Sequence, residues 1–157
     1  MTAPEGPNHQ DSDRASHTAV RLLSRREHST LELRRKLQIR GFDSDGINEV
    51  IEQLNHDGLL SDERFTESYV RMRMSKGYGP MRIRAELQER GVADDLIARY
   101  LVNDEEFWFE QALDAREKKF GTGKPGDIKN YNRQARFLQQ RGFNTGIVRK
   151  ILGSYYT

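Results

Sequence analysis

The chain closes a helix in the same way three times, and this repetition limits its possible folds more than any other feature. The closing segments are KLQIRGF (36–42), ELQERGV (86–92) and FLQQRGF (137–143). Their glycines are separated by 91 − 41 = 50 and 142 − 91 = 51 residues. A leucine precedes each glycine by four residues, and apolar or aromatic residues follow it at nine and ten residues. We therefore predict three copies of one three-helix unit, which stack because a copy of about 50 residues buries little surface alone.

The middle copy carries the clearest helix signals. Phe65, Tyr69 and Met72 recur at spacings of four and three, which predicts a helix with one buried stripe. This helix is expected to end at Gly77. Pro80 then opens the next helix, because proline at the first helical position loses only an amide hydrogen that has no partner there.

The third copy departs from the pattern in two places. Gln134 stands where the first two copies have Leu33 and Ile83, which leaves the register of this copy open. The segment GTGKPG (121–126) has the glycines and lysine of a phosphate-binding loop. It lacks the G-x-x-x-x-G-K-[ST] order and a preceding strand, so we interpret it as a surface turn that lengthens this copy.

These signals predict an all-α fold, an elongated and curved array of three tandem three-helix repeats with about nine helices. We expect repeats at residues 16–60, 61–103 and 104–157. Residues 1–15 are rich in Pro, Gly, Asn, Asp and Ser without a helical period, and this composition predicts a disordered N-terminal tail.

Composition excludes several classes of protein. Among 157 residues, 35% are hydrophobic and 32% are charged, and no apolar run is long enough to span a membrane. The sequence has no cysteine, which excludes disulfides and fits a reducing cytoplasm. No secretory signal is visible, so we expect a cytoplasmic protein without a membrane partner.

The sequence contains no recognisable catalytic pattern. Motifs of metalloproteases and of α/β-hydrolases are absent, and the four histidines lie in the N-terminal segment or at predicted helix ends. Paired acids at 94–95 and 105–106 begin predicted helices, where they compensate the helix dipole. We therefore predict no enzyme, no catalytic residue, no cofactor and no metal site.

The placement of charge is more informative than the net charge of +2. Between Ser68 and Ala85 there are five basic residues and no acid, and the last third of the chain is also rich in Lys and Arg. Such runs indicate either a solvated face or a surface for an anionic partner, a protein filament or a nucleic acid. Tyr78 in GYGP is either a packing anchor or an exposed aromatic contact. The candidate partner-binding residues are Arg71, Arg73, Lys76, Tyr78, Arg82, Arg84, Lys129, Arg133 and Arg136.

An arginine precedes each closing glycine, at Arg40, Arg90 and Arg141. A cation at this position stabilises the carbonyl end of its own helix. The fixed spacing would also present three guanidinium groups to a periodic partner, and the sequence leaves both interpretations open.

The residues of the middle copy carry a family resemblance. The run GLLSDERF (58–65), the following YVRMR (69–73), GYGP (77–80) and IRAELQERGV (83–92) resemble the signature of the RecX family, bacterial regulators of the RecA recombinase. The resemblance extends from about Ser16 to the C-terminus.

This resemblance implies a non-enzymatic protein that binds the RecA filament on single-stranded DNA. It also implies inhibition of ATP hydrolysis, strand exchange and co-protease activity, and thereby modulation of recombination and DNA repair. The alternative is a helical module that binds single- or double-stranded DNA directly, because three-helix units with basic helices resemble helix-turn-helix domains. We expect a monomer. The resemblance does not identify the contact residues, which the charge pattern selects.

Overall fold

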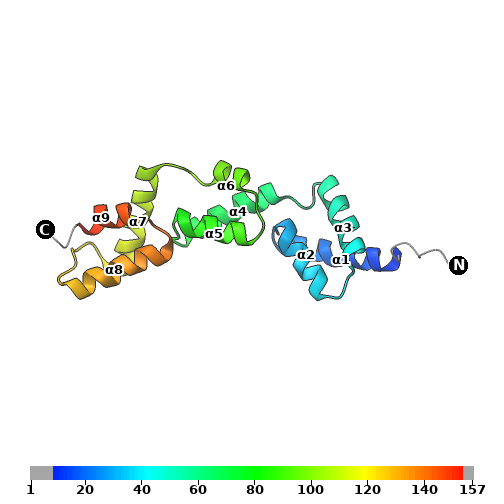
Figure 1. Cartoon of the computed structure of the whole chain (residues 1–157), viewed down its shortest axis with the longest axis horizontal. Coiled ribbons are helices and arrows are strands. Elements are labelled where there is room, and N and C mark those ends of the chain that lie inside the picture. The colour runs from blue at the N-terminus through cyan, green and yellow to red at the C-terminus, as the bar shows by residue number, and fades with distance from the viewer. Residues whose placement is uncertain (1–8, 154–157) are drawn as a thin grey trace. The chain divides into compact units, whose positions relative to one another are not determined.

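The computed structural model describes residues 9–153, and this part of the chain contains nine α-helices and no strand (Figure 1). The all-α prediction is confirmed. The first three helices are α1 (His9–Arg25), α2 (Thr30–Ile39) and α3 (Ser44–His56). The middle three are α4 (Asp62–Ser75), α5 (Pro80–Glu89) and α6 (Asp94–Tyr100). The last three are α7 (Glu105–Phe120), α8 (Ile128–Arg141) and α9 (Thr145–Leu152). None of the described helices combines the length and apolarity that a membrane crossing requires.

The repeated closing segment forms the same helix end each time. Gly41, Gly91 and Gly142 all have positive φ angles, of 89°, 76° and 102°. A glycine adopts this conformation without the steric cost of a Cβ atom. In the first and third segments, the amide of the residue after the glycine donates to the carbonyl of the leucine, from Phe42 to Leu37 at 3.2 Å and from Phe143 to Leu138 at 3.1 Å. The spacing of leucine and glycine in the sequence thus reflects one capping motif.

Side-chain caps begin several of the helices. Asp43 accepts a hydrogen bond from the amide of Gly46 at 2.7 Å, and Asn144 accepts one from Ile147 at 2.8 Å. Each cap satisfies an amide that has no partner within its helix. These polar residues therefore fix the starts of α3 and α9.

The prediction of a disordered tail through Ala15 is wrong for the residues that the structure describes. Helix α1 begins at His9, and Ala15 and Ala19 are fully buried. The buried stripe of this helix uses alanines, with Leu22 following, so its polar composition concealed a helical period. Residues 1–8 lie outside the described part of the chain.

Contacts divide the chain into two compact units. Of the described residues, the first contains 9–68 together with Arg90–Val92, and the second contains Tyr69–Glu89 and 93–153. In the first unit, α1 packs on α3 around a core that includes Leu33, Leu37 and Ile47. In the second, α7, α8 and α9 pack on one another. Its buried residues include Ile83, Leu87, Trp108, Leu138, Phe143 and Ile147.

The register of the third repeat follows that of the other two. Leu138 is fully buried, as Leu87 is, and Gln134 is buried at the position of Ile83. The amide oxygen of Gln134 accepts a hydrogen bond at 3.0 Å from the Nε of Arg116, a residue that is only 4% exposed. A buried cation on α7 therefore explains the polar residue at an otherwise apolar position.

Candidate partner-binding surface

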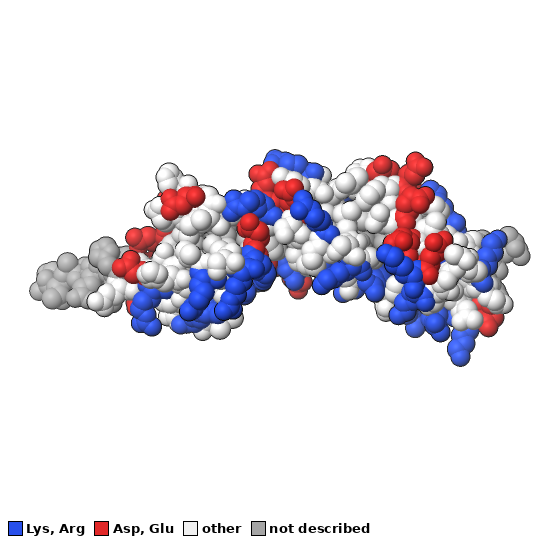
Figure 2. Space-filling model, turned by 180° about the vertical axis from the view of Figure 1, so that it is seen from behind, with Lys and Arg blue, Asp and Glu red and all other residues white. Residues whose placement is uncertain are grey.

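The nine candidate residues all lie in the second unit. Six of them belong to α4, the α4–α5 turn and α5, and three belong to α8. On the face that Figure 2 shows, Lys and Arg side chains gather over parts of each unit, and Asp and Glu side chains lie among them. Basic side chains on this face therefore lie in several areas with acidic side chains among them.

Two of the predicted contact residues are held by one carboxylate. Glu86 on α5 accepts hydrogen bonds from Arg73 Nη2 at 2.6 Å and from Arg82 Nε at 3.0 Å. The hydroxyl of Tyr69 also donates to this carboxylate. Burial acts to raise the pKa of Glu86, but the hydrogen bonds from Arg73, Tyr69 and Arg82 outweigh it and hold that pKa below 4.5. The pair of Arg73 and Glu86 thus has a structural role within the second unit.

Tyr78 lies at the centre of a group of guanidinium groups. The Cζ atoms of Arg73, Arg82 and Arg141 stand 3.7, 4.5 and 4.6 Å from the centroid of its ring. Cations over an aromatic ring are attracted by its quadrupole. These contacts fit the interpretation of Tyr78 as a packing anchor in the turn, and its role as a partner contact stays a prediction.

The other members of the middle group are exposed. The side chains of Arg71, Lys76 and Arg84 face solvent, although the backbone carbonyl of Lys76 accepts a hydrogen bond from Arg141 at 2.9 Å. The structure thus separates the six middle residues into Arg73, Arg82 and Tyr78, which contact one another or Glu86 although Arg82 is also exposed, and three residues whose side chains face solvent.

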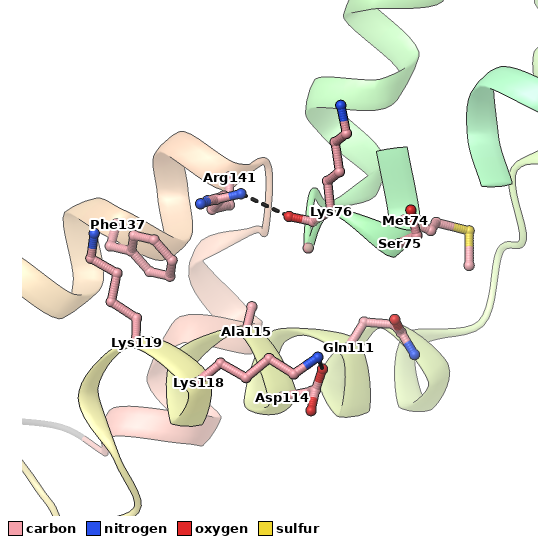
Figure 3. A pocket seen from close by; sticks show the side chains of 11 residues that line it. Met74, Ser75, Lys76, Gln111, Asp114, Ala115, Lys118, Lys119, Phe137 and Arg141 are labelled. Atoms are coloured by element: carbon pink, nitrogen blue, oxygen red, sulfur yellow. Dashed lines mark hydrogen bonds and ion pairs between the residues drawn. The ribbon is translucent and has the colours of Figure 1, made fainter. Parts of the chain in front are cut away.

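Arg141 crosses a pocket of about 270 Å³ that α4, α7 and α8 line (Figure 3). Its guanidinium reaches the carbonyl of Lys76, with Phe137 5.0 Å away and Lys118 paired with Asp114 on the facing helix. The dipole interpretation of the sequence missed this contact, because it considered only the helix that carries the arginine.

The three arginines before the glycines have different roles. Arg40 donates to the carbonyl of Lys36 in its own helix at 3.2 Å, as the dipole interpretation predicts. Arg90 lies 3.7 Å from Glu32, and Arg141 bonds a carbonyl beyond its own helix. Two of the three arginines, Arg90 and Arg141, therefore contact the preceding repeat.

The three candidates of α8 line a separate groove of about 690 Å³. Arg133 lies over the ring of Phe120 at 5.2 Å, and Lys119 lies over that of Phe137 at the same distance. The residues that line the groove are Lys119, Phe120, Lys129, Asn132, Arg133, Arg136, Phe137 and Gln140. No acid is among them, so the charged residues of this groove are all basic.

Sequence reasoning missed Glu86 and Lys119. Arg82 and Glu86 are four residues apart on one helix, a spacing that favours an ion pair and could have revealed the carboxylate. Lys119 lies on α7, and only the packing of α7 against α8 brings it to the groove.

Within residues 9–153, no group of three or more His, Cys, Asp or Glu side chains could hold a metal ion. The absence of cofactors and of catalytic residues remains a prediction. Helices in three successive sets, with basic exposed faces, define a tandem helical-repeat protein of the kind whose surfaces serve for binding.

Comparison with known proteins agrees with this class. Models of the first, second and third three-helix domains of RecX match residues 15–54, 61–101 and 105–152. The chain therefore belongs to the RecX family of regulatory proteins, and the resemblance seen in the sequence is confirmed.

Individual relatives support the assignment. Regulatory protein RecX of Halorhodospira halophila is 46% identical over 138 residues, which cover 88% of this chain and 86% of the relative. The RecX of Pseudomonas putida is 42% identical, with 86% of each chain covered.

Solved structures show the same fold. The crystal structure of RecX from Lactobacillus salivarius matches with a TM-score of 0.75 at 24% identity, over 92% of this chain and 96% of that one. A second crystal structure of a regulatory protein RecX matches with a TM-score of 0.77 at 19% identity, over 96% and 81%.

Proposed function

We propose that this protein binds the RecA filament on single-stranded DNA and inhibits its ATPase, strand-exchange and co-protease activities. It would thereby modulate recombination, DNA repair and the SOS response in the cytoplasm. The observation that carries the proposal is membership of the RecX family across all three repeats.

The exposed basic residues of the second unit supply suitable contacts. Arg71, Lys76 and Arg84 face solvent on or beside α4 and α5, and Lys129 and Arg136 face it on α8. Several modest contacts on one monomer bind an assembled filament better than a free subunit, because each further contact forms at high effective concentration. Arg73, Arg82 and Tyr78 support this surface through their contacts with one another and with Glu86.

The test is the rate of ATP hydrolysis by RecA on single-stranded DNA as the protein is added up to equimolar amounts. We expect strong inhibition by the wild type and weaker inhibition when Arg71, Lys76 and Arg84 are changed together to alanine. Leaving Arg73 and Arg82 intact keeps the Glu86 contacts. A control in which the exposed Arg14 and Arg21 of α1 and Arg25 at its end become alanine removes the same charge from the first unit.

The alternative is a module that binds DNA directly. An ATPase rate that the wild type leaves unchanged, together with affinity for bare DNA that falls steeply with salt, would reject the filament regulator in its favour. Inhibition that the triple change leaves intact would reject only the proposed contact residues.

A further inference from the structure

In the first repeat, the start of α2 contacts the C-terminal end of α5, a helix of the next repeat. The hydroxyl of Ser29 donates to the carbonyl oxygen of Arg90 at 2.8 Å, and Arg90 Nε lies 3.7 Å from the carboxylate of Glu32. Gly91 faces Leu31, and a Cβ atom on this glycine would stand 2.8 Å from the leucine Cβ. The start of α2 therefore offers the hydroxyl of Ser29 to the carbonyl of Arg90 and the carboxylate of Glu32 to its guanidinium.

In the second repeat, the start of α5 contacts the C-terminal end of α8 in the equivalent place. The amide of Gly79 donates to the carbonyl of Arg141 at 2.6 Å, and that of Met81 donates to the carbonyl of Gly142 at 3.1 Å. The guanidinium of Arg82 donates to a third carbonyl of this helix end at 2.9 Å. Two of the three repeats thus bind the carbonyl-rich end of a helix at the start of their own second helix.

In the third repeat, this position has no following repeat in the described chain. With the 51-residue spacing, Gly79 and Arg82 correspond to Asn130 and Arg133. Helix α8 begins earlier than α5 in this register, at Ile128, and the amide of Asn130 already donates to the carboxylate of Asp127 at 2.8 Å. A helix end therefore cannot be bound there through the same amide.

The third face also lacks the acid that each of the other two carries, although Arg82 of the second repeat already stands at the position of Glu32. With the same spacings, Glu32 of the first face corresponds to Arg133, and Glu86 of the second corresponds to Phe137. The groove at this position is lined by four cations and no acid. Within the described residues, Lys129 and Arg136 have no hydrogen bond or ion pair, so their charges are available to a partner.

We propose that this face, which we call the terminal face and define by Lys119, Lys129, Arg133 and Arg136, binds an acidic polypeptide segment of a partner protein. Carboxylates of the segment pair with the cations, and carbonyls at its helix end accept from the arginines as they do from Arg82 in the second repeat. The terminal face could serve the proposed regulator as one of its contacts, but its chemistry is testable without RecA.

A nucleic acid and a second copy of this chain fit the terminal face less well than an acidic polypeptide does. The corresponding faces of the first two repeats both bind polypeptide, and cations lie over the rings of Phe120 and Phe137, where a stacked base would otherwise lie. A second copy of this chain would present the Arg40 and Gly41 helix end, whose arginine repels the four cations.

The experiment is a fluorescence-anisotropy titration of the full chain with three labelled probes. The first is a helix-forming peptide of about 15 residues rich in glutamate, and the second has glutamine for each glutamate. The third is an oligo-dT of similar charge. The test variant carries Arg133→Glu and Arg136→Glu, and the control carries Arg14→Glu and Arg21→Glu on α1, where both arginines are exposed. Trp108 fluorescence, which reports from the second unit, verifies that the variants are folded.

We expect the acidic peptide to bind, the glutamine peptide to bind at least about tenfold more weakly, and the test variant but not the control to lose about tenfold in affinity. Absence of acidic-peptide binding overturns the proposal. Equal or tighter oligo-dT binding that the test variant loses also overturns it and makes the face a nucleic-acid site. If the wild type inhibits the RecA ATPase but does not bind the peptide, the terminal-face proposal fails and the proposed function stands.

Discussion

Gly142 lies so close to Arg82 that a Cβ atom on the glycine would stand 2.5 Å from the arginine Cβ and 2.6 Å from its backbone nitrogen. A Cβ atom on Gly91 would stand 2.8 Å from the Cβ of Leu31, whereas one on Gly41 would meet nothing within 4 Å. The repeated glycine thus has two functions: all three positions need a left-handed residue, and two of them also need space for the preceding repeat.

These environments predict unequal costs for the same substitution. Gly41→Ala should lower the free energy of unfolding by about 1 to 2 kcal/mol, the cost of a left-handed residue with a Cβ atom. Gly142→Ala should cost more, at least about 3 kcal/mol, because the backbone of Arg82 must also move. Urea unfolding followed by circular dichroism measures both. Equal losses at the two positions would contradict a packing role for Gly142.

Much of the fold could be predicted from the sequence because its signals are local. The spacing of Leu37, Leu87 and Leu138 from their glycines reflects a helix end that a left-handed glycine closes, and the carbonyls of Leu37 and Leu138 accept a backbone hydrogen bond there. Helix α1 was shortened in the prediction because its buried stripe is made of Ala15 and Ala19, which carry little hydrophobic signal. The spacing of apolar residues was therefore enough to predict a helix wherever large apolar side chains form its buried face.

The candidate surface was predicted less well because charge pattern does not report contacts. Arg73 and Arg84 look alike in the sequence, yet Arg73 is bound to Glu86 and Arg84 is exposed. What separates them is the packing of α4 beside α5, and the carboxylate that binds Arg73 lies 13 residues away. A basic run therefore identifies a region, and the tertiary fold decides which of its members face a partner.

The ionised carboxylate of Glu86 should stabilise the second unit at neutral pH. Glu86→Gln leaves Arg73 and Arg82 without their shared negative charge, so we expect a loss of about 2 kcal/mol at neutral pH. Urea unfolding monitored by the fluorescence of Trp108, which is buried in the same unit, measures this loss. Glu110→Gln, on an exposed position of α7, is the matched control and should change stability little.

Glu86→Gln should also change how the free energy of unfolding depends on pH in the acid range. Because the pKa of folded Glu86 lies below 4.5, its contribution is present above pH 4.5 and is lost as the pH falls through the folded pKa. Wild type should therefore lose more stability than Glu86→Gln between neutral pH and about pH 3. Parallel losses in the two proteins would show that this carboxylate is not the group responsible.

His28 should make the first unit sensitive to mild acid. Its ring is 1% exposed and bonds the carbonyl of Arg26 at 3.0 Å and Lys36 Nζ at 2.8 Å, which fits a neutral ring. Burial is the main cause that lowers the pKa of His28 below 6.5, and it outweighs the hydrogen bond to the Arg26 carbonyl, which raises that pKa. The charges of Arg26 and Lys36 also lower the pKa, and that of Glu32 raises it. The unfolded state therefore binds the proton more readily, and stability is lost as the pH falls below about 6.5.

NMR titration of the ring should place the transition of His28 below 6.5. His28→Gln offers the same donor and acceptor without a titrating group, so amide exchange in α1 to α3 should depend less on pH between about 7 and 5 in this variant. An unchanged pH dependence would assign the acid sensitivity to another group.

Gln134 should be needed only because Arg116 is buried beside it. Gln134→Leu restores the apolar residue found in the other repeats, but it removes the acceptor for Arg116 Nε. An unpaired buried donor costs about 1 to 3 kcal/mol, so we expect this substitution to destabilise the second unit, again measured through Trp108.

The double variant Arg116→Met and Gln134→Leu replaces both partners with apolar groups and should recover most of the stability that Gln134→Leu loses. Arg116 also donates to the carbonyl of Gly123, so the recovery should be incomplete, with faster amide exchange in the 121–126 loop. A double variant less stable than either single variant would mean that the two residues stabilise the repeat independently. Recovery would instead show that the third repeat keeps the register of the other two and differs from them by one exchanged buried pair.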